Sequence, residues 1–177
     1  MTTTMQTDTQ NVLQHGISVW AFTQRIMNRQ WEGMKIPKWL SENKDYILAN
    51  LHDTETIENY NIYHDCGKPF CLHIDSDGRR HYPNHAEVSY NTYLAYFECK
   101  VTATLIRNDM LIHTARTDQI NQVNLSKKDL LTLLITALAE VHSNAEMFGG
   151  IESISFKMKY KKIEQRGNQI IKNITNE

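Results

Sequence analysis

A nearly continuous apolar run, LLTLLITALA at positions 130–139, constrains the fold more than any other part of the sequence. Ser126 precedes the run, and Asp129 comes three residues after Ser126, which is a variant of the capping box that starts helices. A helix that is apolar on most of its sides is buried at the centre of a protein. Glu140 comes next and needs a partner, because an unpaired buried carboxylate is costly. We expect a central helix that continues to the pair Gly149-Gly150, with other helices packed around it.

Apolar residues at helical spacing recur through most of the remaining chain. Gly33 separates the first predicted helix from the second, Asp53 or Thr54 is placed to cap the third, and Asn84 is placed to cap the fourth. The predicted helices cover residues 8–31, 37–51, 54–65, 85–99 and 101–113. The fold class that these patterns predict is all-α, a mostly helical bundle.

The C-terminal segment 151–177 has a different pattern. Apolar residues from Ile154 to Tyr160 alternate with polar ones, and a period of two favours a short strand. A helical body offers such a strand no evident partner, so an extra terminal helix is the alternative. Residues 157–172 hold six basic residues against Glu164 as the one acidic residue. The predicted organisation is a flexible segment 1–8, one domain at 9–150 and a basic C-terminal extension 151–177 packed on that domain or extending it.

Composition narrows the class of protein. The 177 residues carry a formal net charge of −1, so overall charge does not attract polyanions and any anionic partner must meet a local patch. Three cysteines, Cys66, Cys71 and Cys99, lack the paired spacing of zinc sites and argue against a disulfide scaffold. No apolar run reaches the length of a membrane span, and the N-terminus lacks a hydrophobic signal core. We therefore expect a cytoplasmic protein without a membrane partner.

Metal-binding and phosphate-binding residue types meet in one stretch, NIYHDCGKPF. His64 and Asp65 end the third predicted helix, and a loop over 66–84 follows. We predict that this pair holds a divalent metal ion. The loop and the start of the next helix supply candidate phosphate-binding side chains: Lys68, Arg79, Arg80 and His85.

The segments VLQHGISV, NIYHDCGKP and HYPNHAEVS together resemble the HD superfamily of metal-dependent phosphohydrolases. Members carry a histidine on an early helix, a His-Asp pair at the end of a later helix, and a further aspartate downstream. The resemblance spans about residues 12–148 and is greatest to the HD modules of tRNA nucleotidyltransferases and RNA-end-repair phosphoesterases. It implies removal of a 2′- or 3′-phosphate from nucleotides or nucleic-acid ends, including the opening of 2′,3′-cyclic phosphates.

The resemblance also implies a metal site made by His15, His64, Asp65 and one more acidic residue. Imidazoles and carboxylates suit manganese, cobalt, nickel, zinc or iron, and magnesium is a further candidate. Such an ion lowers the pKa of bound water and polarises a phosphoryl oxygen.

The identity of the fourth ligand stays open between three residues. The family aspartate often follows an alanine in an apolar helix, and the comparable place here holds Glu140. We favour Asp109, because His113 and Arg116 follow it at i+4 and i+7 on one predicted helix face. Asp118 is the third candidate. In the favoured arrangement Glu140 orients a ligand histidine.

The implied catalytic set is Asp65, Lys68 and His85. Lys68 is expected to bind a phosphate oxygen as a point charge, and Arg79 or Arg80 to clamp phosphate through two hydrogen bonds. His85 is expected to contact phosphate and protonate the leaving oxygen, or to bind a second metal ion.

Other functions are compatible with the same residues. The site could instead hydrolyse a dNTP or a nucleoside monophosphate, or the chain could bind a nucleotide or RNA without catalysis. The basic extension is a candidate RNA contact. The expected partner is a nucleotide or nucleic-acid-end substrate, and an oligomer is compatible with the sequence.

Overall fold

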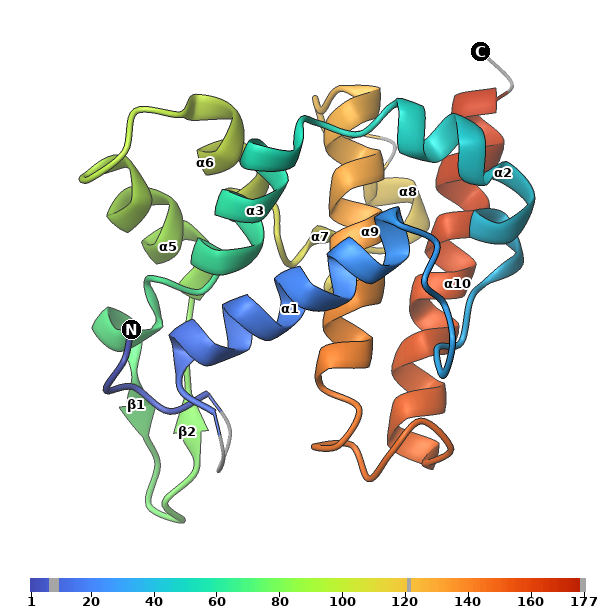
Figure 1. Cartoon of the computed structure of the whole chain (residues 1–177). Coiled ribbons are helices and arrows are strands. Elements are labelled where there is room, and N and C mark those ends of the chain that lie inside the picture. The colour runs from blue at the N-terminus through green and yellow to red at the C-terminus, as the bar shows by residue number, and fades with distance from the viewer. Residues whose placement is uncertain (7–9, 121, 176–177) are drawn as a thin grey trace.

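The computed structural model describes residues 1–6, 10–120 and 122–175, with the backbone alone at 117 and 118. The fold is mostly α, as predicted, and the strands within these ranges form one antiparallel pair (Figure 1). Within them, no helix has both the length and the apolar character of a membrane span. The elements are α1 (Val12–Met27), α2 (Lys38–Ala49), α3 (Thr54–Tyr63), α4 (Lys68–Cys71), β1 (His73–Ile74), β2 (Arg80–His81), α5 (His85–Leu94), α6 (Lys100–Arg107), α7 (Leu111–Thr114), α8 (Thr117–Ile120), α9 (Lys127–Ser143) and α10 (Ile154–Thr175).

The apolar run forms the central helix α9, and residues 131–139 are all buried. Its start is the predicted capping box of Ser126 and Asp129. Helix α1 crosses α9 and α10 runs beside it (Figure 1). The helix ends at Ser143, earlier than predicted, because the backbone leaves helical geometry at Asn144, which has φ −89° and ψ 6°. The chain then turns through residues 144–150 before α10 begins.

Helices α1 and α3 cross at a glycine. A Cβ atom built on Gly16 would lie 2.4 Å from the carbonyl oxygen of Ile62, so the two backbones are in direct contact. His15 precedes that contact on α1, and His64 follows α3 at its C-cap position. This close crossing brings the two predicted metal-binding histidines together.

The region 66–84, which we predicted as a loop, contains short regular structure. Helix α4 is a single turn, and β1 and β2 form a hairpin closed by the predicted turn at Asp75–Gly78. Gly78 has φ +78°, a conformation that side-chain-bearing residues rarely adopt. Gly67 fixes α4 against α5, since a Cβ there would lie 2.3 Å from the backbone nitrogen of Ser89. The segment that follows Asp65 is therefore firmly positioned.

The predicted helices 8–31, 37–51, 54–65, 85–99 and 101–113 are all shorter in the structure. Helix α1 covers less than 8–31, and α5 stops before residue 99. The predicted helix 101–113 is broken after α6, where the side chain of Asn108 donates to the carbonyl of Thr104. The prediction that Asp109, His113 and Arg116 share one helix face is therefore wrong, because a turn at 108–110 separates α6 from α7.

The C-terminal extension is a long helix, α10, so the alternative to a strand is confirmed. Ile154 and Met158, which gave the period of two, are exposed at 78% and 61%. The buried positions instead follow helical spacing from Phe156 to Ile174. Gly167 lies directly on the indole of Trp39, where a Cβ would be 2.3 Å from the ring nitrogen.

The first six residues, predicted to be flexible, lie against the hairpin. The carbonyl oxygen of Met5 accepts hydrogen bonds from Tyr82 and Arg80, at 2.7 and 3.3 Å. The N–H of Val12 donates to the carbonyl of Thr4. Part of the predicted flexible segment, residues 7 and 8, lies outside the described residues.

Candidate functional site

Three of the predicted metal ligands meet where α1 crosses the end of α3. The donor atoms of His15, His64 and Asp65 lie within 4.8 Å of one another. Nε2 of His64 is 3.2 Å from Oδ2 of Asp65, and Nε2 of His15 is 4.0 Å from the same oxygen. All three side chains are buried. Two imidazoles and a carboxylate on a rigid frame form a donor set for a first-row divalent ion.

Several polar atoms of this cluster have no hydrogen-bond partner in the described chain. Nδ1 of His64 lies 2.7 Å from the carbonyl oxygen of Asn61, which accepts its proton and leaves the lone pair on Nε2. That Nε2, both ring nitrogens of His15 and Oδ1 of Asp65 are buried and make no hydrogen bond of acceptable geometry, although Nε2 of His64 lies 3.2 Å from Oδ2 of Asp65. Unpartnered buried polar atoms are rare because they are costly. A divalent cation would satisfy these atoms together, so the donor set fits a metal.

The surroundings of the cluster are acidic. Burial opposes a charged imidazole at His64, but the carboxylates of Asp65 and Asp109 outweigh it and raise the pKa of His64 to about 10. Burial also opposes ionisation of Asp65, yet His64 and Lys68 hold its pKa well below the usual range. A field that favours a proton on His64 equally favours a metal cation beside it.

Asp109, the favoured fourth ligand, lies at the site but outside the group of three. Its side chain is 4% exposed and accepts a hydrogen bond of 2.7 Å from the hydroxyl of Tyr60. Burial raises the pKa of Asp109. The side chain of Asp118, the third candidate, lies outside the described residues.

Glu140 lies between two histidines. Its Oε1 is 3.8 Å from Nε2 of His15, and its Oε2 is 2.8 Å from Nε2 of His113. Burial opposes the charge on Glu140, but the neighbouring His113 outweighs it and holds the pKa of Glu140 well below its usual range. His113 thus supplies the partner that the carboxylate of Glu140 needs in the central helix, and Glu140 lies where a residue orienting His15 is expected.

A pocket of about 230 Å³ opens beside the cluster and is lined by all three predicted catalytic residues. Nζ of Lys68 lies 2.5 Å from Oδ2 of Asp65 and 2.8 Å from Oε1 of Gln6. Nε2 of His85 is 3.7 Å from Oδ1 of Asp65. A cation and an imidazole therefore face one space with the candidate metal ligand Asp65, and both can donate hydrogen bonds to a phosphate group.

Arg79 and Arg80 lie elsewhere, on the exposed hairpin. Neither is among the described residues that line the pocket. Arg80 pairs in register with Ile74 on β1, and its guanidinium donates to the carbonyl of Met5. The backbone N–H of Arg79 donates to the side chain of Asp75 in the turn. Arg79 ends the turn of the hairpin and Arg80 begins β2, so the structure does not bring either to the pocket.

Sequence reasoning missed three contributors to the site. Lys159 lines the pocket from α10, Gln6 bonds to Lys68, and Tyr60 bonds to Asp109. Tyr60 had a usable signal, because it precedes His64 by four residues and shares its helix face. Lys159 belongs to the basic extension identified in the sequence, but interpreting residues 154–160 as a strand did not predict which way its side chain points.

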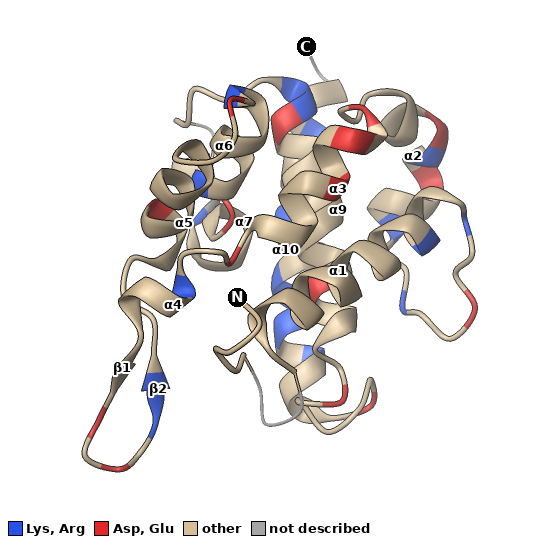
Figure 2. Cartoon of the chain, turned by 60° about the vertical axis from the view of Figure 1, so that its left-hand side comes forward, with Lys and Arg blue, Asp and Glu red and all other residues tan. Residues whose placement is uncertain are grey.

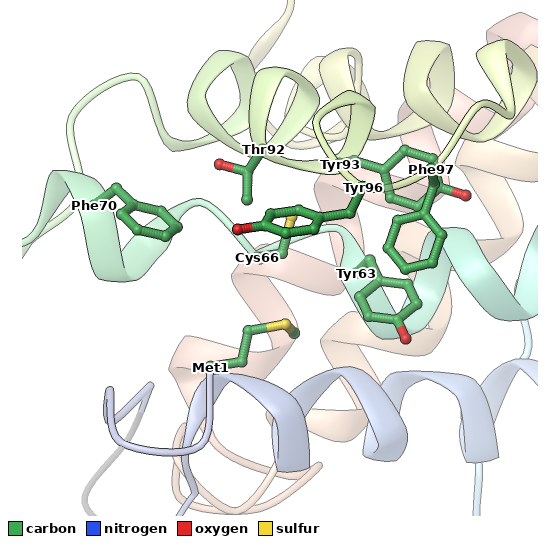
Figure 3. Close-up of a pocket in the computed structure, with 8 residues that line it drawn as sticks. All are labelled: Met1, Tyr63, Cys66, Phe70, Thr92, Tyr93, Tyr96 and Phe97. Carbon is green, nitrogen blue, oxygen red and sulfur yellow. The ribbon is translucent and has the colours of Figure 1, made fainter.

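A second pocket, of about 210 Å³, is lined by apolar and aromatic side chains (Figure 3). Tyr63 and Cys66, which flank His64 and Asp65 in sequence, contribute to it. Its other lining residues are Met1, Phe70, Thr92, Tyr93, Tyr96 and Phe97. None of the described lining side chains is a carboxylate, imidazole or basic group, so of these two pockets only the first has side chains that could bind a metal ion and a phosphate.

Comparison of the chain with protein-family models, curated proteins and solved structures finds no match.

Proposed function

We propose that this chain is a metal-dependent phosphohydrolase of the HD type. One observation carries the proposal: the unpartnered buried donor atoms of His15, His64 and Asp65 converge beside a pocket that also holds Lys68. A cluster with only a structural role would be expected to satisfy these atoms within the protein. The candidate substrates are nucleotides and nucleic-acid ends that carry a 2′- or 3′-phosphate or a 2′,3′-cyclic phosphate.

Each side chain has a role that follows from its position. His15, His64 and Asp65 would hold the metal, with Asp109 as the proposed fourth ligand. When bound, a divalent ion supplies acidified water and polarises a phosphoryl oxygen. Lys68 is anchored on Asp65 and presents its charge in the pocket, where a phosphate oxygen would replace the amide oxygen of Gln6. His85 faces the same space and would donate a proton to the leaving oxygen.

The test measures phosphate release by the full-length protein supplied with Mn²⁺, Co²⁺ or Ni²⁺. Substrates are 3′-phosphorylated and 2′,3′-cyclic-phosphate oligonucleotides, compared with free nucleoside monophosphates and dNTPs. We expect His64→Ala and Asp65→Ala to abolish release. His81→Ala is the matched control, because His81 also pairs with an aspartate, Asp75 at 2.8 Å, but on the exposed hairpin. Unchanged release by both site variants would contradict the proposal.

Metal content separates catalysis from simple binding. We expect the wild-type protein to retain a divalent ion after reconstitution and dialysis, and His64→Ala to retain less. A protein that binds nucleotide but takes up no divalent ion and releases no phosphate would be a non-catalytic binding module instead.

A further inference from the structure

Lys159 connects the candidate pocket to the exposed surface of α10. Its side chain lines the pocket together with Asp65 and Lys68, and its Nζ lies 5.2 Å from the centroid of the Phe148 ring. Figure 2 shows Lys and Arg recurring along α10. The pocket is therefore bordered by the most basic element of a chain whose net charge is only −1.

Helical geometry divides the basic residues of α10 into two groups. Lys159, Lys162 and Arg166 are spaced i, i+3 and i+7, so they form a row along one side of the helix, and this row starts at the pocket with Lys159. We call these three residues the basic stripe. Lys161 is adjacent to Lys162 in sequence but turned by about 100° around the helix axis. Both are exposed, yet only Lys162 extends the side that begins in the pocket.

The far end of the basic stripe is fixed against α7. Nη1 of Arg166 donates to the carbonyl oxygens of Ile112 and His113, the latter at 2.8 Å. His113 itself lines the pocket. The stripe therefore runs alongside the wall of the pocket, and it begins and ends at residues tied to that wall.

We propose that the basic stripe binds the backbone of a single-stranded nucleic acid whose terminal phosphate occupies the pocket. The proposal rests on the proposed function and deepens it, because it names a polymer end as the substrate class instead of a free nucleotide. At about 1.5 Å per residue the stripe is about 10 Å long. At about 3.4 Å per nucleotide of a stacked strand, that length matches about three nucleotides. A mononucleotide in the pocket has no second phosphate to meet Lys162, which lies one helical turn beyond Lys159.

The experiment compares neighbouring lysines of the same helix. Binding of a short, fluorescently labelled, 3′-phosphorylated single-stranded oligonucleotide is measured by anisotropy over a range of salt concentrations, with EDTA present so that turnover does not interfere. Lys162→Gln is expected to weaken binding roughly three- to ten-fold at low salt and to lower the slope of log affinity against log salt by about 0.7. Lys161→Gln, the matched control with the same loss of charge, is expected to leave both quantities close to wild type. A nucleoside 3′-monophosphate is expected to bind Lys162→Gln and wild type equally.

Three results would overturn the inference. Equal weakening by Lys161→Gln and Lys162→Gln would mean general attraction to a charged helix. Equal loss of mononucleotide affinity in Lys162→Gln would place Lys162 in the pocket and remove the need for a strand. An oligonucleotide that binds no more tightly than the mononucleotide would exclude a track. Failure of the proposed function is a separate result, because binding is measured without turnover. Phosphate release that is unchanged in both His64→Ala and Asp65→Ala would reject the proposed metal site and would not affect the binding measurements on Lys161→Gln and Lys162→Gln.

Discussion

Gly16→Ala is expected to destabilise the protein, although the same substitution usually stabilises a helix. Alanine is favoured over glycine within a helix by about 1 kcal/mol. At position 16, however, the new Cβ would lie 2.4 Å from the carbonyl oxygen of Ile62 and 2.9 Å from its carbonyl carbon. Both are backbone atoms, so no side chain can rotate away. Helices α1 and α3 must separate to accept the methyl group.

The geometry gives the size of the effect. Restoring an ordinary contact of 3.4 Å requires a separation of about 1 Å at the crossing. Overpacking costs about 1–3 kcal/mol, and a clash with backbone atoms belongs in the upper part of that range, about 2–3 kcal/mol, so the gain in helix propensity of about 1 kcal/mol leaves a net loss of about 1–2 kcal/mol. For a chain of this length the melting temperature should fall by about 2–8 °C.

The same separation should weaken metal binding. His15 lies next to Gly16 on α1, whereas His64 and Asp65 follow α3, so moving the helices apart divides the cluster. Metal–ligand distances tolerate only about 0.2 Å. We therefore expect Gly16→Ala to bind Mn²⁺ or Co²⁺ at least about ten-fold more weakly.

Thermal melts followed by circular dichroism, together with calorimetric metal titrations, test both expectations. Gly167→Ala is the matched control: its Cβ would lie 2.3 Å from the indole of Trp39, in the contact of α10 with α2. It should lower stability and leave metal affinity unchanged. The reasoning is refuted if Gly16→Ala melts at or above the wild-type temperature, or if it loses stability while its metal affinity stays the same.

Two further predictions concern buried polar groups. Burial, aided by Arg25, lowers the pKa of His142 to about 4, so the folded state holds fewer protons than the unfolded state between pH 6.5 and 4. The free energy of unfolding should therefore fall as the pH is lowered from 6.5 to 4. In urea unfolding, His142→Gln should lose about 3 kcal/mol less than the wild type over this pH range. An equal loss in both proteins would contradict the assignment to His142. Tyr60→Phe removes the hydroxyl that donates a hydrogen bond to buried Asp109 and should lower the free energy of unfolding by about 1–3 kcal/mol in the same assay. An unchanged free energy of unfolding would show that Asp109 does not depend on the Tyr60 hydroxyl.

Much of the fold could be predicted because local signals and burial agree. The capping box at Ser126 and the run after it indicated α9, and Asp53 caps α3 as expected. The break after α6 was not predictable in the same way, because apolar residues at helical spacing lie on both sides of the polar residues 107–109. The side chain of Asn108 ends that helix by bonding to Thr104, and nothing in the hydrophobic pattern indicates such a choice.

The extension 151–177 shows how a short pattern misleads. Ile154 and Met158 contributed half of the period-two alternation, yet both are exposed, so they carried no information about the core. The helical period becomes visible only when Ile163 and Gly167 are included with Phe156. The same error hid Lys159, because the direction of a side chain could not be assigned before the type of element was known.

The candidate site was predictable as a set of residue types, but its assembly depends on contacts between backbones. Gly16 follows His15 directly, Gly67 follows Asp65 by two residues, and each is where a Cβ would strike the backbone of another helix. The geometry of the cluster is thus fixed at two points of closest helix approach. Side chains in the core can repack around a substitution, whereas these backbone contacts cannot yield without moving a ligand. Glycine substitutions next to the site should therefore disturb metal binding more than losses of larger apolar side chains elsewhere in the core.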